Sequence, residues 1–303
     1  MSTSSVLFDT PGPRARLRNH GLTLLTLVAV AAAAYVVYVK FDEKNQWEWK
    51  IWEPFVQAST WTDYIIPGLV GTLKAASLAA VLALLFGAIF GLARLSDHKW
   101  IRIPAGLVVE VFRAIPLLLL IFFIFYLAPS VMGGGDYAFV AVVVGLMLYN
   151  GSVLAEVVRA GVLSVPRGQS EAAYAIGLRK GGVMRLVLLP QAVTAMMPAI
   201  VSQLVVLLKD TALGYIIAYV DLLNMGFKII PARFFGSLIP AAIVIGIIYI
   251  SLNMALSALA TWLEKRSRRS RKTAAPPVAP PGALPAGVTL KGGPGAGAVA
   301  TME

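Results

Sequence analysis

The chain has 303 residues, of which 58% are hydrophobic and only 14% are charged. Soluble domains carry about 25% charged residues, so this composition excludes an ordinary soluble globular protein. The chain has no cysteine, which excludes disulfides and thiolate metal sites. Neither His20 nor His98 has a plausible cluster of ligands around it, so no metal ion or other cofactor is expected on this chain.

Six apolar stretches are long enough to cross a membrane, which takes about 20 mostly apolar residues. Polar connections separate them, and their few charges and glycines are tolerated inside a helical bundle. The sequence therefore predicts an all-α integral membrane protein with about six transmembrane helices. The stretches are residues 21–39, 64–94, 104–128, 138–158, 190–208 and 238–262.

The net charge of +11 is distributed in four basic groups that alternate with outer connections. Residues 14–18, 94–102, 159–185 and 265–272 hold most of the 26 lysines and arginines. Lys and Arg accumulate on cytoplasmic loops, so both termini and residues 159–189 are predicted to be cytoplasmic in a multi-pass cell-membrane protein. A nucleic-acid-binding patch is the alternative, and this alternation argues against it.

Residues 1–20 are predicted to form a basic cytoplasmic N-terminus, and residues 21–39 a transmembrane anchor. The apolar core is longer than the roughly 7–15 residues of a signal peptide. Small residues at 31–34 make a cleaved signal peptide the alternative. The apolar run continues past them through Tyr38, which favours an uncleaved anchor.

Residues 40–63 are predicted to connect the first two spans on the outer side. They contain four tryptophans, which favour the membrane–water interface because the ring is apolar and its N–H is hydrated. An interfacial segment is therefore favoured, with a tryptophan-rich substrate site as the alternative. The tryptophans are Trp47, Trp49, Trp52 and Trp61.

Residues 213–237 begin apolar but contain Asp221, Lys228 and Pro231. A seventh span here would place the basic residues 265–272 outside, so a short re-entrant or interfacial element on the outer side is predicted. Residues 263–303 are predicted to be a cytoplasmic tail, basic at first and then disordered, because its Ala, Pro and Gly offer little to bury.

Ionisable residues within spans are costly and indicate a function or a pairing. Two pairs, Glu110 with Arg113 and Glu156 with Arg159, share the spacing that places both side chains on one helix face. Mutual neutralisation is the favoured interpretation, and a substrate path lined by Glu110 and Arg113 is the alternative. Three more residues lie near the ends of spans, where they either flank a substrate path or extend toward the interface. They are Lys74, Lys209 and Asp210.

The cytoplasmic residues 159–189 contain a predicted short helix with small side chains. Glu171 lies early in that helix, where the positive end of the helix dipole favours a carboxylate. Gly177 is predicted to end the helix, and Gly181 with Gly182 to form a second turn before a span that begins at Pro190. A short helix with a defined end fits a groove on a partner protein.

Residues 171–190 read EAAYAIGLRKGGVMRLVLLP and fit the spacing E-A-A-x3-G-x9-I-x-L-P, with valine in place of isoleucine. This resembles the cytoplasmic coupling loop of membrane subunits of binding-protein-dependent ABC importers. Segments around Glu110, Glu156 and Lys209 further resemble the histidine/glutamate-type permeases for polar amino acids. The residues that carry the loop motif are Glu171, Ala172, Ala173, Gly177, Val187, Leu189 and Pro190.

The resemblance implies a five-helix, MetI-like core over residues 64–262, to which residues 21–39 add the anchor helix. It also implies a sister permease in a homo- or heterodimer, two ATP-binding subunits that bind ATP and Mg, and an external solute-binding protein. No G-x-x-x-x-G-K-[ST] phosphate loop occurs in the sequence, so the chain is expected to be non-catalytic. The predicted function is ATP-driven import of polar amino acids, glutamate or a related one.

Two other functional classes are alternatives to this prediction. An ion-gradient-driven secondary amino-acid transporter is the main alternative, and it would show internal repeats and an ion site at the membrane midplane. No repeat is apparent between the two halves, and the loop motif would have no role. A membrane enzyme is disfavoured because no cysteine, histidine cluster or pair of loop carboxylates is available for catalysis.

Overall fold

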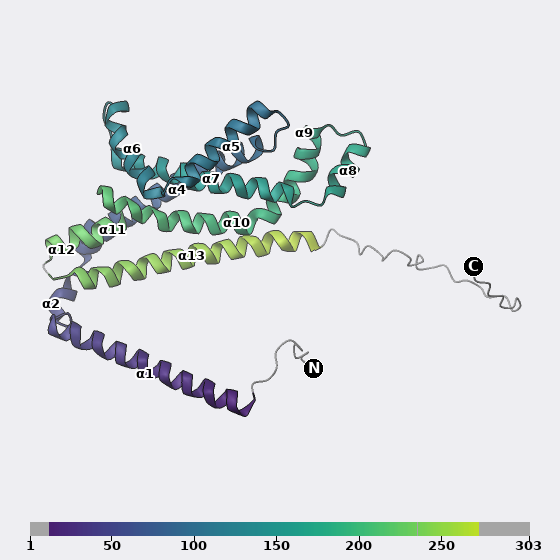
Figure 1. The fold of residues 1–303 in the computed structure, drawn as a ribbon. Coiled ribbons are helices and arrows are strands. Elements are labelled where there is room, and N and C mark those ends of the chain that lie inside the picture. The colour runs from purple at the N-terminus through teal and green to yellow at the C-terminus, as the bar shows by residue number, and fades with distance from the viewer. Residues whose placement is uncertain (1–11, 235, 273–303) are drawn as a thin grey trace, which may run out of the picture.

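The computed structural model describes residues 12–234 and 236–272 (Figure 1). Every regular element within them is helical, which confirms the predicted all-α class. Five helices are long and apolar enough to cross a membrane, or six if one bent pair counts as a single span. The predicted disordered tail at 273–303 lies outside the described residues.

The first helix, α1 (Pro13–Glu43), stands apart from the other helices and buries none of its residues. Pro13 suits the first turn, because the N–H that it lacks would be unpaired there. The helix extends beyond the predicted limits 21–39 at both ends. The flanking residues include Arg, Leu, Lys and Glu, which are good helix formers.

The predicted outer connection forms a chain of short helical turns between α1 and α4. Three of its tryptophans donate to backbone carbonyls: Trp52 Nε1 to Gln46 at 2.7 Å, Trp61 Nε1 to Phe55 at 2.8 Å and Trp47 Nε1 to Tyr38 at 3.5 Å. Their N–H groups therefore hold the connection together. The elements are α2 (Trp49–Trp52), a 3-10 turn (Glu53–Phe55), α3 (Ala58–Thr60) and a π-helical turn (Trp61–Ile65).

Helices α4 (Ile66–Ala93) and α7 (Tyr137–Leu163) pack closely at the centre of the bundle (Figure 1). A Cβ added to Gly87 would lie 2.6 Å from the Cβ of Leu154, so the two backbones approach as only small residues permit. The buried face of α4 consists almost entirely of alanine and glycine. Small side chains thus position α7 and the residues that it carries.

The predicted span 104–128 is wrong as a single helix. It is divided into α5 (Lys99–Ala114) and α6 (Leu117–Val131), which are bent by 101°. Pro116 explains the break, because proline pushes the preceding residue out of the helical region. Ile115 accordingly has ψ 126°, and the helix ends there.

The predicted turn at Gly181–Gly182 is also wrong, because the helical path already begins at Lys180. It passes through α9 (Lys180–Gly182), a π-helical stretch (Val183–Leu188), α10 (Leu189–Asp210) and a 3-10 turn (Thr211–Ile217). Glycine tolerates helical geometry at modest cost. Pro190 is the second residue after the π-helical stretch, close to the point where the hydrogen-bond register changes.

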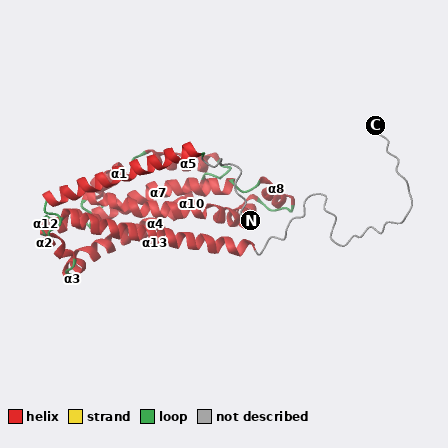
Figure 2. Cartoon of the chain, turned by 90° about the horizontal axis from the view of Figure 1, so that it is seen from below, coloured by secondary structure: helices red, strands yellow, loops and turns green. Residues whose placement is uncertain are grey.

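Short helices cover α4 at the end of the molecule near α2, and none is long enough to span a membrane. They are followed by the last long helix. In Figures 1 and 2, α1 begins and α13 ends on the side of α8, opposite α2 and α12. The remaining elements are α11 (Leu222–Asn224), a π-helical turn (Met225–Ile229), α12 (Ile230–Arg233) and α13 (Leu238–Lys272).

Candidate functional site

The predicted partner-binding segment contains α8 (Arg167–Ala175), which projects with α9 beyond the ends of the long helices (Figure 1). Pro166 directly precedes the helix with φ −54° and ψ 134°. Its ring fixes φ, which defines where the helix can start. The structure therefore places a short helix where the sequence predicts one.

Gly177 ends α8 as predicted, with a φ of +87° that side-chain-bearing residues rarely adopt. The Gly177 N–H donates to the Tyr174 carbonyl at 2.9 Å, and the Leu178 N–H donates to the Ala173 carbonyl at 3.1 Å. These two bonds form a Schellman motif, which satisfies carbonyls that a helix end otherwise leaves free. A nine-residue helix thus has a sharply defined end.

The outward face of α8 combines small and apolar side chains with one carboxylate. Glu171 and Ala172 are exposed, and Ala173 is buried. Tyr174 is 49% exposed and Ile176 is 79% exposed, which is high for large apolar residues. Exposed apolar side chains beside small ones suit contact with another protein.

The inner face of α8 packs against the π-helical stretch Val183–Leu188. Gln191 Nε2 also donates to Gln169 Oε1 at 3.3 Å, which ties α8 to the start of α10. The two halves of the loop motif therefore lie on two packed elements. Val187 and Leu189 are partly buried, whereas Pro190 is exposed.

A salt bridge between Lys180 and Asp97 joins the loop to the connection between α4 and α5. Lys180 Nζ also donates to the Leu95 carbonyl at 3.3 Å. The hydrogen bond from Lys180 lowers the pKa of the Asp97 carboxyl. Sequence analysis missed this contact, because nothing in either segment indicates that they are neighbours.

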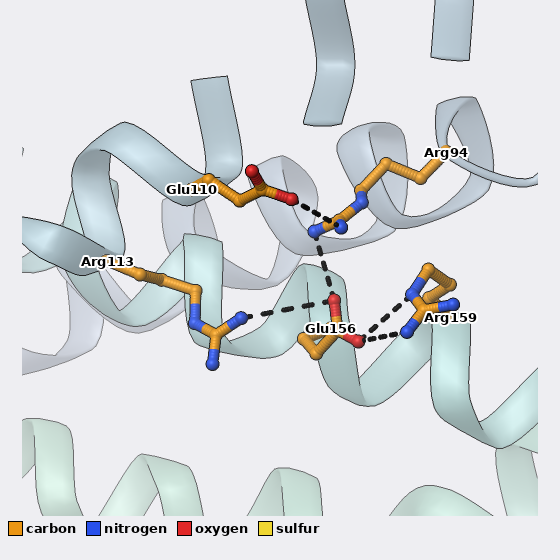
Figure 3. A network of polar contacts seen from close by, with 5 residues as sticks. All are labelled: Arg94, Glu110, Arg113, Glu156 and Arg159. Carbon is orange, nitrogen blue, oxygen red and sulfur yellow. Dashed lines mark hydrogen bonds and ion pairs between the residues drawn. The ribbon is translucent and has the colours of Figure 1, made fainter. Parts of the chain in front are cut away.

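Glu156 on α7 lies at the centre of an arginine cluster (Figure 3). Its carboxylate accepts from Arg159 Nε at 3.0 Å and lies 3.0 Å from Arg94 Nη1 and 4.0 Å from Arg113 Nη1. Arg94 also reaches Glu110 at 3.2 Å. Helices α5 and α7 and the residue that ends α4 are thus joined by one ionic network.

The predicted pairing of Glu110 with Arg113 is therefore wrong, whereas the pairing of Glu156 with Arg159 is confirmed. Shared helix spacing makes the first pair possible, but Arg94 and Glu156 from other elements provide closer partners. In the sequence, Arg94 is only one of the basic residues that indicate which connections are cytoplasmic. Its role depends on how α4 and α7 pack.

The other predicted path residues lie away from this cluster. Lys74 Nζ lies 4.8 Å above the ring of Phe139. Lys209 lines a cavity of about 650 Å³ between α10 and α13, together with Tyr249 and Asn253. Asp210 is the last residue of α10. The structure therefore separates Lys209 from Glu110 and Arg113 instead of gathering all of them around one path.

Residues 83–269 match the protein family described as binding-protein-dependent transport system inner membrane component. The chain belongs to this family. The matched region contains α8, the arginine cluster and the cavity beside Lys209. The resemblance predicted from the loop motif is thereby confirmed.

Individual relatives narrow the subfamily to amino-acid permeases. The chain is 43% identical over 222 residues to the glutamate transport system permease protein GluD of Corynebacterium glutamicum, covering 73% of this chain and 81% of the relative. It is 31% identical over 211 residues to the glutamate/aspartate import permease protein GltK of Escherichia coli O157:H7, covering 67% and 93%. A crystal structure of an amino acid ABC transporter with histidines matches with a TM-score of 0.61 and 32% identity, covering 68% and 95%.

Proposed function

We propose that this chain is the translocating subunit of an ATP-driven importer that carries glutamate or a related polar amino acid into the cell. The observation that carries the proposal is α8: a short helix with a defined end that displays Glu171 and Ala172 to solvent beyond the bundle, with Ile176 exposed directly after its last residue. Such a surface suits a groove on an ATP-binding subunit.

The proposed assembly has two ATP-binding subunits that hold ATP and Mg, a second permease subunit and an external solute-binding protein. Both termini and α8 lie on the cytoplasmic side in this arrangement. Two observations support this arrangement. The start of α1 and the end of α13 lie on the same side of the molecule as α8, and the connections on that side are positively charged.

Movement of α8 would reach the membrane helices through two sets of contacts. The packing of α8 on Val183–Leu188 leads directly into α10, and the Lys180–Asp97 salt bridge leads to α5. Closure of the ATP-binding subunits would shift both helices together. Rigid-body shifts of packed helices are a common means of coupling distant sites.

The proposed substrate path includes the cavity beside Lys209. Its ammonium group provides a cation for a carboxylate, and Tyr249 and Asn253 provide polar side chains from α13. Because the relatives include permeases named for glutamate and for aspartate, an acidic amino acid is the first substrate to test.

The proposal is tested by uptake of labelled glutamate, aspartate and histidine into proteoliposomes that contain the assembled complex and enclosed ATP. ATP-dependent uptake should occur and should be lost in Glu171→Lys. Glu48→Lys is a matched control, because Glu48 is an exposed carboxylate on the opposite end of the molecule. Uptake by the chain alone, driven by an ion gradient and indifferent to Glu171→Lys, would overturn the proposal.

A further inference from the structure

A second cavity, of about 410 Å³, opens beside the arginine cluster and is distinct from the one beside Lys209. It lies between α5, the end of α4 and the last turns of α7. Cationic side chains come from all three elements. The residues that matter are Arg94, Arg102, Arg159, Glu110, Ile103 and Leu107.

The cavity keeps an excess of positive charge after its internal ion pairs are formed. Glu110 forms a salt bridge with Arg94, and Glu156 forms salt bridges with Arg94, Arg113 and Arg159. Arg102 is exposed and forms no salt bridge with any described residue, and its attraction to Asp97 acts only over a longer distance. An anion that enters the cavity would therefore meet at least one guanidinium group free to bind it.

The rim of the same cavity is apolar and faces outward. Ile103 is 62% exposed and Leu107 is 63% exposed, and Trp100 lies on the same helix face with 83% exposure. In water, such a face would be costly. Beside a bilayer it would contact acyl chains, with the tryptophan at the interface.

We propose that this cavity binds the phosphate of an anionic phospholipid, such as phosphatidylglycerol, whose acyl chains lie along Ile103 and Leu107. Basic pockets between membrane helices on the cytoplasmic side bind anionic headgroups in this way. The site rests on the proposed cytoplasmic position of this end of the bundle. Bound lipid would join α5 to the ends of α4 and α7.

Native mass spectrometry of the detergent-purified full chain tests the site, with phosphatidylglycerol or phosphatidylcholine added. Phosphatidylglycerol should be retained in preference to phosphatidylcholine. Arg102→Gln should weaken its retention about fivefold, as expected for one cation near an anionic headgroup. Lys99→Gln is the matched control, because Lys99 is an exposed cation on the same helix but does not line the cavity.

A second variant separates a lipid from a free anion. Leu107→Ser should weaken retention of phosphatidylglycerol and leave any binding of inorganic phosphate unchanged. Equal retention of the two lipids, unchanged binding in Arg102→Gln, or displacement of the lipid by an equal concentration of inorganic phosphate would overturn the proposal. The measurement needs neither ATP nor an amino acid, so its failure would leave the transport role standing.

Discussion

The two ends of the helical bundle are built on different principles. At the end near α12, segment 218–233 packs on α4, and its polar side chains Asp221 and Asn224 are buried. At the end near α8, the polar contacts include ion pairs whose members remain partly exposed, such as Lys180 at 43% and Asp97 at 74%. Both ends are closely packed, but the end near α8 adds partly exposed ion pairs to its packing.

This difference matches what each end is expected to do. Tight backbone contacts allow few alternative arrangements, because packed interiors tolerate little change in volume. Partly hydrated ion pairs contribute little stability and can exchange partners. A helix that must follow a partner subunit is better placed at the second kind of end.

The largest effect should come from breaking the close packing. A Cβ on Gly71 would lie 2.0 Å from the Val220 carbonyl oxygen, so Gly71→Ala must displace backbone. We expect a loss of about 1–3 kcal/mol or more in the free energy of unfolding, measured by thermal unfolding in detergent. Gly246→Ala on α13 meets nothing within 4 Å. Equal stability of the two variants would show that the contact at Gly71 does not hold this end.

Asp221 offers a pH test of the same end, in the connection between two spans. Burial raises the pKa of Asp221 to about 6, whereas the unfolded carboxyl titrates near 3.8. The unfolded state therefore loses its proton first. The free energy of unfolding should fall by about 3 kcal/mol as pH rises through this window and then level off.

Asp221→Asn should remove most of that pH dependence. The new amide oxygen can still accept the hydrogen bond that the backbone N–H of Asn224 now donates to Asp221 Oδ1. Asp63→Asn changes an exposed carboxyl near the same end and serves as the control. A wild-type profile that is flat between pH 4 and 6, or one that Asp63→Asn flattens equally, would contradict a buried, protonated Asp221.

At the charged end, the effect should depend on how many partners a residue has. Glu156→Gln leaves Arg94, Arg113 and Arg159 without their shared carboxylate, and should cost about 1–2 kcal/mol, since Glu156 is only 26% exposed. Glu110→Gln removes one contact of a carboxylate that is 67% exposed and should cost much less. Thermal unfolding of both variants tests this order. A larger loss of stability in Glu110→Gln than in Glu156→Gln would contradict the network described here.

The smallest effect on stability is expected from the Lys180–Asp97 salt bridge. Lys180→Glu should leave the unfolding temperature nearly unchanged, because both side chains are partly exposed to solvent, and exposed ion pairs contribute little to stability. It should instead reduce the amount of amino acid imported per ATP hydrolysed. If Lys180→Glu combined with Asp97→Lys restores the amount of amino acid imported per ATP hydrolysed, the loss is due to this pair. An unchanged ratio in Lys180→Glu alone would show that the pair is not part of the proposed coupling route.

Features that depend on neighbouring residues could be predicted from the sequence. The end of α8 at Gly177 is set by φ and by hydrogen bonds within a few residues, and the spans are set by local hydropathy. Pro116 carried a local signal for the break between α5 and α6, but the apolar composition on both sides concealed it. A hydropathy pattern records how apolar a stretch is and not whether it is straight.

Contacts between distant segments could not be predicted in the same way. Spacing on one helix placed Glu110 beside Arg113, but the packing of α4 on α7 brings Arg94 and Glu156 closer to them. The Lys180–Asp97 contact likewise requires knowledge of how two connections meet. Residues that belong to one short motif could therefore be identified from the sequence, whereas contacts that link different helices required the structure.

The most direct test of the central claim is photo-crosslinking from α8 in the assembled complex. The chain contains no cysteine, so Ala172→Cys provides a single site for a maleimide-linked benzophenone. Val220→Cys, exposed at the opposite end, is the control. We expect a crosslink from position 172 to the ATP-binding subunit that changes in yield with ATP, and none to that subunit from position 220. Equal labelling from both positions, or no product from position 172 in a complex that transports amino acid, would contradict it.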